Sequence, residues 1–390
     1  MIAVLPGMGF EAARNADITV QGGSVHEALR VPGLGPDGRH QLTRAMRVAF
    51  TLVSALVIGA APVGLPGPAG AQSVGDVFRK VNPAVLVIRA KGQDVEAAAG
   101  GLTRFTETGS GVLVSADGKV MTAAHVVHSM DEINVEFLGG ETVSARVVSS
   151  EPAADLSLLQ LQSVPKGVKP ALLADSDTVR VGDQILIVGA PYGLSHSMSA
   201  GWISARWPAN SVYRSMPLAE FLQTDATINT GNSGGPMFNM AGEVIGIVSH
   251  NISKSGGSEG LGFVVTINTA KTLLLERPSF WSGLDGRLIS GPIAQILNLP
   301  QPTGYLVKSV ARGSTGDALG LRGGAALATI MGEQLVVGGD IILKVQGISV
   351  GEASDHRRVR DILDSVPPGG EFTMTVLRLG KVMELKGRHP

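Results

Sequence analysis

Short strand-like runs separated by turns dominate the middle of the chain, and they limit the possible folds more than any other feature. These runs cover residues 84–89, 111–114, 120–122, 133–137, 143–148, 156–161, 185–188, 221–224, 244–249 and 261–265. Between the second and third runs, Asp117-Gly118 supplies the positive φ angles that a tight hairpin needs. Many short strands at this spacing predict a β-sandwich or β-barrels.

Composition agrees with a turn-rich β protein. Only 4% of the residues are aromatic and 52 of the 390 are glycine, which suits short strands and turns better than a helical bundle. The length predicts two or three domains. Lys and Arg number 32 against 33 Asp and Glu, so no basic surface for nucleic acid is expected. The absence of cysteine excludes thiol catalysis, disulfides and thiolate metal sites.

The N-terminal part contains a pattern of protein export. Residues 1–45 are rich in Gly and Pro and show no helix or strand periodicity, so we expect no fold there. Arg44 and Arg47 then precede an apolar run over 48–61, and a small-x-small sequence ends at Ala71. A basic start, an apolar centre and a small-x-small ending are typical of a secretory signal.

We therefore expect a signal peptide over 46–71 that is cleaved after Ala71. Met46 would then be the true start, and residues 1–45 an artefact of gene calling. The alternative is an uncleaved anchor that tethers a membrane-bound scaffold. The apolar run is shorter than the ~20 residues that a membrane-spanning helix needs, which favours cleavage.

A serine flanked by glycines lies between Thr230 and Pro236, in the sequence Gly231-Asn232-Ser233-Gly234-Gly235. Gly231 can adopt backbone angles that are closed to other residues and leaves room for a ligand close to the main chain. A serine on such a turn can expose its hydroxyl while neighbouring N–H groups point into one small space. An oxyanion hole needs this geometry.

A serine hydroxyl becomes a good nucleophile only beside a base, which is itself oriented by a carboxylate. His125 follows a strand-like run in the sequence Thr-Ala-Ala-His, and Asp155 begins the sequence Asp-Leu-Ser-Leu-Leu. The order His, Asp, Ser is that of the double-β-barrel proteases. His128 and Asp225 are the nearest competitors for the two roles, and we interpret both as structural.

Five motifs together resemble the HtrA/Deg family of serine proteases. They are Gly109-Ser110-Gly111-Val112, residues 122–127, residues 155–161, Gln223-Thr224-Asp225-Ala226 and residues 231–236. The resemblance implies a mainly β fold, with a chymotrypsin-like protease domain of two antiparallel β-barrels followed by one PDZ domain. It assigns His125 as general base, Asp155 as its orienting carboxylate and Ser233 as nucleophile.

The same resemblance places the oxyanion hole at the backbone N–H groups of Gly231, Asn232 and Ser233. Asn232 stands where digestive relatives carry an aspartate that pairs with a newly cut N-terminus. An amide cannot form that ion pair, so we expect activation by loop rearrangement instead of chain cleavage. Thr230 departs from the proline usual in the family, which removes a fixed φ before the loop.

In chymotrypsin-like enzymes, the position six residues before the nucleophilic serine lies at the base of the primary specificity pocket. In this chain that position is Thr227, which carries no carboxylate. Ile228 and the segment Leu261-Gly262-Phe263 would form an apolar wall. We therefore expect cleavage after small or medium aliphatic residues, and not after Arg or Lys.

We expect a protease domain over 72–276, a linker over 277–282 and a PDZ domain over 283–390. Asn268 is predicted to cap a closing helix over 268–276. In the last domain we predict strands at 304–310, at 339–343 together with Gly347-Ile348, and at 372–376. A helix capped by Ser354 carries apolar residues at 359, 362, 363 and 366. The family's usual loop is enlarged at 324–337, and the sequence indicates no role for this insertion.

The PDZ groove is expected near Ser282, Gly283 and Leu284, where an extended peptide would add as a strand. The family more often has an apolar residue in place of Ser282, which weakens the case for tight C-terminal binding. The alternative is a domain that only docks on the protease.

These features predict an exported, periplasmic serine endopeptidase that degrades unfolded or misfolded proteins. Its partners would be unfolded polypeptides and C-terminal peptides, and the resemblance implies a homotrimer. No cofactor, metal or nucleic acid is expected. A weakly proteolytic chaperone or peptide-binding protein with the same fold is the alternative from another functional class.

Overall fold

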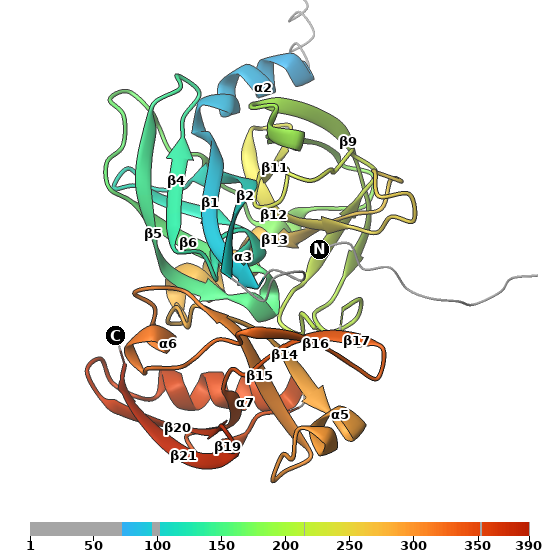
Figure 1. Cartoon of the computed structure of the whole chain (residues 1–390). Coiled ribbons are helices and arrows are strands. Elements are labelled where there is room, and N and C mark those ends of the chain that lie inside the picture. The colour runs from blue at the N-terminus through green and yellow to red at the C-terminus, as the bar shows by residue number, and fades with distance from the viewer. Residues whose placement is uncertain (1–71, 96–101, 214, 352, 390) are drawn as a thin grey trace, which may run out of the picture. The chain divides into compact units, whose positions relative to one another are not determined.

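The computed structural model describes residues 72–95, 102–213, 215–351 and 353–389, and all of these belong to one compact unit. The predicted signal peptide and the segment before it lie outside the described residues. Residues 85–161 form a closed six-stranded barrel, blue to green in Figure 1. Its strands, in barrel order, are β1 (Val85–Val95), β2 (Leu102–Leu113), β3 (Lys119–Thr122), β6 (Leu156–Leu161), β5 (Thr142–Glu151) and β4 (Glu132–Glu136).

A second antiparallel ring follows in the sequence. Its order is β11 (Pro236–Asn239), β8 (Gln184–Gly189), β9 (Ser197–Trp207), β10 (Phe221–Thr224), β13 (Gly262–Thr266) and β12 (Glu243–Asn251). Pairing of β11 with β12 closes this ring, and the short β7 (Leu172–Leu173) adds to β12 in parallel. The chain is therefore mainly β with a chymotrypsin-like pair of barrels, as the sequence predicts.

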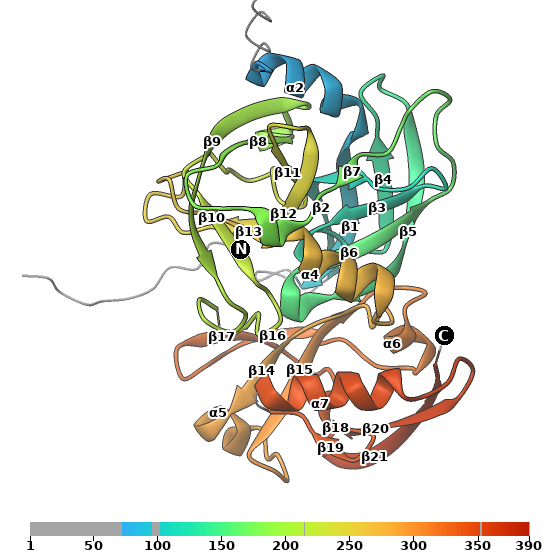
Figure 2. The same cartoon turned by 180° about the vertical axis from the view of Figure 1, so that it is seen from behind.

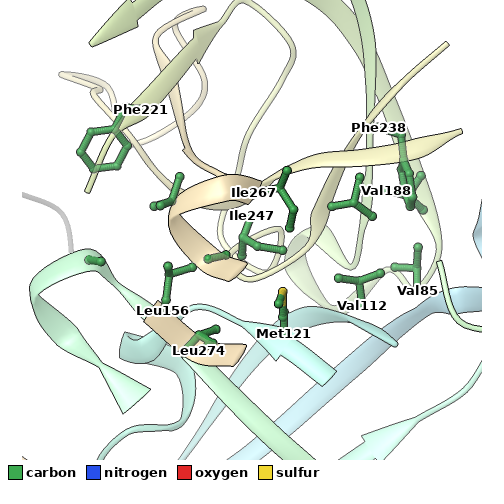
Figure 3. Packing of buried hydrophobic residues seen from close by; sticks show 14 of the residues in the cluster. Val85, Val112, Met121, Leu156, Val188, Phe221, Phe238, Ile247, Ile267 and Leu274 are labelled. Carbon is green, nitrogen blue, oxygen red and sulfur yellow. The ribbon is translucent and has the colours of Figure 1, made fainter. Parts of the chain in front are cut away.

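A continuous apolar core joins the two barrels (Figure 3). Val112 and Met121 contribute from the first barrel, and Val188 and Ile247 from the second. All four are fully buried, and burial of such side chains stabilises a fold by roughly 1.5–3 kcal/mol each. The loops that meet at this junction are consequently held by both barrels.

Short helical segments connect the strands. They are α2 (Val74–Val81), η1 (Asn82–Ala84), α3 (Ala124–Val127), η2 (Pro152–Ala154), η3 (Ser176–Thr178) and η4 (Pro191–Gly193). The helix α2 begins with a capping box, in which Ser73 and Asp76 each accept from the other's backbone amide. No helix within the described ranges has the length and apolar character to cross a bilayer.

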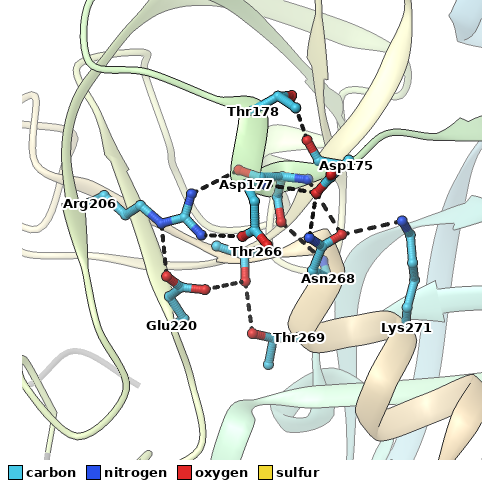
Figure 4. Close-up of polar contacts among 10 residues, drawn as sticks. Asp175, Asp177, Thr178, Arg206, Glu220, Thr266, Asn268, Thr269 and Lys271 are labelled. Atoms are coloured by element: carbon cyan, nitrogen blue, oxygen red, sulfur yellow. Dashed lines mark hydrogen bonds and ion pairs between the residues drawn. The ribbon is translucent and has the colours of Figure 1, made fainter.

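The helix after β13 starts one residue before its predicted start and ends at the predicted residue, Glu276. It starts with α4 (Ile267–Lys271) and continues as the π-helical η5 (Thr272–Glu276), which packs against β5 and β6 of the first barrel (Figure 2). Thr266 occupies the cap position, so the prediction that Asn268 caps this helix is wrong. The Asn268 side chain donates instead to Asp175 at 2.6 Å, within the polar network of Figure 4. The Asn268 side chain therefore bonds a carboxylate 93 residues away instead of the backbone amides at the start of its own helix.

The C-terminal domain contains an antiparallel sheet covered by helices. Its strand order is β14 (Leu284–Ser290), β15 (Thr303–Val310), β18 (Ile341–Val345), β20 (Glu371–Arg378) and β21 (Lys381–Arg388), with β19 (Ile348–Ser349) paired to β18. Three helices, α5 (Gly291–Ile296), α6 (Thr315–Ala318) and α7 (Ala353–Asp364), complete it. Because α7 begins at Ala353, Ser354 lies inside the helix and the predicted cap position is wrong by at least one residue.

The predicted insertion folds as a hairpin of β16 (Ala326–Ile330) and β17 (Glu333–Val337), which pair only with each other. Met331 and Gly332 at its tip have φ angles of 54° and 81°, the sign required at both central positions of a type I′ turn. Leu335 is 3% exposed and packs with Ile289 and Ile341 of the main sheet. The insertion therefore covers an apolar face of the C-terminal sheet.

Candidate active site

The loop that carries Ser233 is anchored to the first barrel by Ser110, a buried residue of β2. The backbone N–H of Ser110 donates to the carbonyl of Ser233 at 2.8 Å, and its hydroxyl donates to the carbonyl of Gly231 at 2.7 Å. Gly234 has a φ of 81°, and a Cβ atom there would overlap Thr122 and Ser110. A glycine directly after Ser233 is thus required by close packing against β2 and β3.

His125 lies in α3, directly after β3 ends. Its ring Nδ1 is 2.9 Å and 3.0 Å from the two carboxylate oxygens of Asp155, and its backbone N–H donates to the same carboxylate at 3.1 Å. The imidazole is 39% exposed and the carboxylate 10% exposed. The structure therefore brings His125 together with the carboxylate that the sequence singles out.

Asp155 is held in a left-handed conformation, with φ of 54°, immediately after η2. Aspartate tolerates this conformation better than most residues. The competing Asp225 has a different partner, since its carboxylate accepts from the backbone N–H of Trp202 at 2.7 Å. Asp225 therefore anchors β9, as predicted for a structural residue.

His125 and Asp155 each shift the pKa of the other toward the charged form. Burial by itself lowers the pKa of His125, but the Asp155 charge and its hydrogen bond outweigh burial and raise the pKa above 6.5. Burial also opposes ionisation of Asp155, yet His125 and the hydroxyl of Ser249 hold the pKa of its carboxyl below 3.8. Near neutral pH, Asp155 is ionised and His125 can exchange a proton.

Ser249 on β12 is a site residue that the sequence analysis missed. Its hydroxyl donates to Asp155 Oδ2, and its carbonyl accepts from the Ser233 hydroxyl at 3.2 Å. Among the described residues, no hydrogen bond joins Ser233 to His125. The serine side chain therefore rests on the β12 backbone and must rotate before His125 can take its proton.

The residues predicted for the oxyanion hole differ in how their amides are used. The N–H of Asn232 donates to the carbonyl of Asn229 at 3.0 Å, within the turn. The amides of Gly231 and Ser233 donate to no other described residue. The carbonyl of Thr230 accepts from the N–H of Tyr192 at 2.7 Å, so a contact with η4 sets this peptide plane.

The five residues of the predicted specificity pocket have different environments. Thr227 is exposed, and Leu261 is 39% exposed. Ile228 is 2% exposed and packs beneath Gly262, where a Cβ atom would meet its side chain. Phe263 is 3% exposed in the core between the barrels. The apolar wall therefore lies mostly below the surface, with Leu261 and Thr227 accessible.

The residues predicted for the PDZ groove lie beside the first barrel. The Ser282 hydroxyl is 3.0 Å from Nε2 of His128, whose Nδ1 is 2.6 Å from the Ser150 hydroxyl. Burial, opposed by the charge of Glu151, lowers the pKa of His128 to about 4. Gly283 has a φ of 67°, and Leu284 begins β14. His128 is thus a buried structural residue, as predicted.

Comparisons with known proteins agree with this arrangement. A family model described as a trypsin-like peptidase domain matches residues 109–247. A probable periplasmic serine endoprotease, DegP-like, from Ectopseudomonas mendocina is 34% identical over 272 residues, which are 67% of this chain. The periplasmic pH-dependent serine endoprotease DegQ of Escherichia coli is 29% identical over 365 residues, which are 88% of this chain. The chain belongs to the HtrA/Deg family of trypsin-like serine proteases.

The matched lengths differ between these family members. This chain spans 56% of the first relative, little more than half its length, and 76% of the second. A solved structure of a variant of the HtrA-type protease AlgW with a decapeptide is 27% identical, with a TM-score of 0.50. That similarity covers 81% of this chain and 96% of the other. It therefore extends beyond the trypsin-like domain of the family.

Proposed function

We propose that the chain is a serine endopeptidase with Ser233 as nucleophile, His125 as general base and Asp155 as its orienting carboxylate. The observation that carries the proposal is the pairing of His125 with Asp155 at the barrel junction where Ser110 anchors the Ser233 loop. Membership of a family of serine proteases supports the same assignment.

In the proposed mechanism, the Ser233 hydroxyl leaves the Ser249 carbonyl and turns to Nε2 of His125. The imidazole takes its proton while the oxygen attacks the substrate carbonyl. Asp155 holds the tautomer with Nδ1–H and stabilises the imidazolium that forms. His125 then protonates the leaving amine, and water releases the acyl-enzyme.

The free amides of Gly231 and Ser233 are the donors we assign to the oxyanion hole. Asn232 would contribute through its N–H only if the turn opened, because that group is already bonded to Asn229. Loss of one such donor typically costs ~3 kcal/mol of transition-state stabilisation. The contact between Thr230 and Tyr192 makes η4 the element that controls this peptide.

The proposed substrates are unfolded or misfolded polypeptides, since a cleft of this kind accepts extended segments. Leu261 and Thr227 at the surface, with Ile228 beneath, favour small or medium aliphatic residues before the cleaved bond. We also propose that the protein acts in the periplasm after signal cleavage and assembles as a homotrimer. The periplasmic relatives support the location.

For the C-terminal domain we propose a PDZ fold that binds extended peptides. The strand β14 is an edge strand, so it can pair with an added peptide strand. The decapeptide in the AlgW structure supports peptide binding in this family. Ser282 is engaged by His128, so peptide binding at this loop would compete with that contact.

The test compares degradation of a permanently unfolded protein by the wild type and by Ser233→Ala, with fluorophosphonate labelling of both. We expect degradation and labelling by the wild type only. Equal proteolysis by the two proteins would contradict the assignment of Ser233. Mass spectrometry of the products measures the residue before each cut and tests the aliphatic preference.

A further inference from the structure

His250 follows Ser249 on β12, and its imidazole contacts the Ser249 hydroxyl that also bonds Asp155. The Ser249 hydroxyl lies between two partners, Oδ2 of Asp155 and Nδ1 of His250, the latter at 2.9 Å. An ionised carboxylate can only accept hydrogen bonds, and a hydroxyl has one proton to donate. Ser249 therefore donates to Asp155 and must accept from His250.

We propose that His250 is a positioning residue, whose Nδ1–H holds the Ser249 hydroxyl in the orientation that donates to Asp155. The inference rests on the proposed function, because it concerns the same carboxylate. It extends the chain of hydrogen bonds from His125 through Asp155 and Ser249 to a second imidazole.

The local backbone explains how neighbouring residues on one strand can face each other. Successive side chains of a regular strand point to opposite faces. Pairing of β12 with β13 is interrupted by a bulge between Val248 and His250, and Ser249 is the extra residue. A bulge re-aims side chains in this way and is common next to active sites.

Aromatic rings fix the plane of the His250 imidazole. It is stacked on Phe263, with ring centres 5.4 Å apart and planes at 11°. Tyr213 and Phe221 meet it edge-on, with ring centres at 4.2 Å and 5.6 Å. Three contacts leave the ring little freedom to turn Nδ1 away from Ser249.

The hydrogen bonds also select the tautomer. His250 Nε2 is buried and has no hydrogen-bond partner among the described residues. A proton on Nε2 would leave a buried donor unpaired and make Nδ1 an acceptor. Nδ1 and Asp155 would then compete for the single proton of Ser249. The neutral form with Nδ1–H is the one that satisfies both Ser249 and Asp155.

The pKa values of the two histidines near Asp155 are shifted in opposite directions. Burial lowers the pKa of His250 to about 4, although the Asp155 charge opposes this and the nearby His125 adds to it. The pKa of His125 is raised. His250 consequently remains a neutral donor across the pH range in which His125 gains and loses its proton.

Two substitutions separate hydrogen bonding from packing. His250→Phe keeps a ring that can stack on Phe263 but has no donor. His250→Asn loses the ring but places an amide N–H near the position of Nδ1. A donor role predicts damage by Phe and rescue by Asn, whereas a packing role predicts the reverse order.

The first measurement is kcat and KM of the full chain on an unfolded protein substrate across pH. For His250→Phe we expect kcat to fall about tenfold, the size of one lost hydrogen bond, with KM nearly unchanged. With fewer donors on Asp155, its charge attracts the His125 proton more strongly, so the acid limb moves to higher pH. His250→Asn should restore most of the wild-type kcat and bring the acid limb back toward its wild-type pH.

The proposal is overturned if His250→Phe keeps the wild-type kcat and pH profile, or if His250→Asn is the more damaging change. A second measurement does not depend on proteolysis: the ring nitrogens of histidine-labelled Ser233→Ala protein are observed by NMR. We expect a protonated Nδ1 and an unprotonated Nε2 for His250, identified by their loss in Ser233→Ala/His250→Phe. A proton on Nε2 alone would overturn the inference whether or not the chain is a protease.

Discussion

Ser110 and His125 show how single residues at the site depend on distant parts of the chain. Ser110 is fully buried, and it also accepts from the N–H of Ala190 at 2.9 Å and from the Thr122 hydroxyl at 2.8 Å. These bonds join β2, β3 and the loops of the second barrel beside Ser233. His125 depends in the same way on Asp155, which is 30 residues away.

The environment of His125 predicts the pH dependence of the proposed reaction. Only the neutral imidazole can act as base, and its pKa is raised, so activity should fall on the acid side with a midpoint above pH 6.5. Asp155→Asn removes the charge that raises this pKa. We expect the midpoint to move to lower pH and kcat to drop on the order of 10⁴-fold.

The measurement is kcat/KM for a quenched peptide between pH 5 and 9 in each protein. Asp225→Asn is the matched control, since that carboxylate binds the N–H of Trp202 and should leave the midpoint unchanged. An unmoved midpoint in Asp155→Asn would show that another group controls the acid limb.

At the level of elements, the β16–β17 hairpin gives a role to the insertion in the C-terminal domain. A two-stranded hairpin alone is marginally stable in water, so this one depends on its packing. Leu335 supplies that packing, together with the partly buried Ile330 and Val337, against the sheet that contains β14 and β15. The insertion therefore extends the core of the domain.

We predict that Leu335→Ala destabilises the C-terminal domain by about 2–4 kcal/mol, through lost burial and the cavity left behind. Denaturant unfolding of the Ser233→Ala protein measures this without self-cleavage. Met331→Ala at the exposed hairpin tip is the control and should change stability by less than about 0.5 kcal/mol. Equal stability of both variants would mean that the hairpin does not contribute to the core.

At the level of the whole described unit, Glu151 joins the protease barrel to the C-terminal domain. Its side chain is 4% exposed at the end of β5, and it binds Arg360 and His356 of α7 and Ser279 of the predicted linker. Burial raises the pKa of this carboxyl, but these three partners outweigh it and lower the pKa below 4.5. Because the folded pKa is depressed, its contribution to stability is present above pH 4.5 and is lost as the pH falls further.

We predict that Glu151→Gln weakens the junction near neutral pH. The Arg360 guanidinium, 9% exposed, then loses the Glu151 carboxylate and keeps only the longer pair with Asp364 of its own helix, at 3.7 Å. Breaking a buried pair typically costs about 3–5 kcal/mol. In the Ser233→Ala background, the variant should show a lower Tm and faster cutting of residues 277–282 by an added protease.

Glu136→Gln is the control for this change, because its pair with Arg89 is partly exposed and joins β1 to β4 within the first barrel. It should leave both measurements near the parent values. If Glu151→Gln also leaves them unchanged, the pair with α7 does not hold the two domains together in solution.

Much of the architecture could be predicted from the sequence, because strand alternation and turn residues act over a few positions. The strands β9 and β11 were not predicted, and each has a local reason. The outward face of β9 carries Met198 and Trp202, so its strand pattern is not that of a half-buried strand. The short β11 begins with Pro236, which obscured it. The motifs that resemble the family singled out His125 and Asp155, whose side chains lie in contact in the structure.

The partners of Ser110, Ser249 and Asn268 were decided by the tertiary structure alone. Ser110 and Gly231 are separated by 121 residues, and Ser249 and Asp155 by 94. No pattern within a strand or turn reports which polar groups will meet when two barrels close on one core. For the same reason the Asn268 side chain bonds Asp175 instead of capping its helix. His250 likewise contacts the Ser249 hydroxyl that bonds Asp155. Local sequence set the elements of this protein, and packing between distant segments set the chemistry of its site.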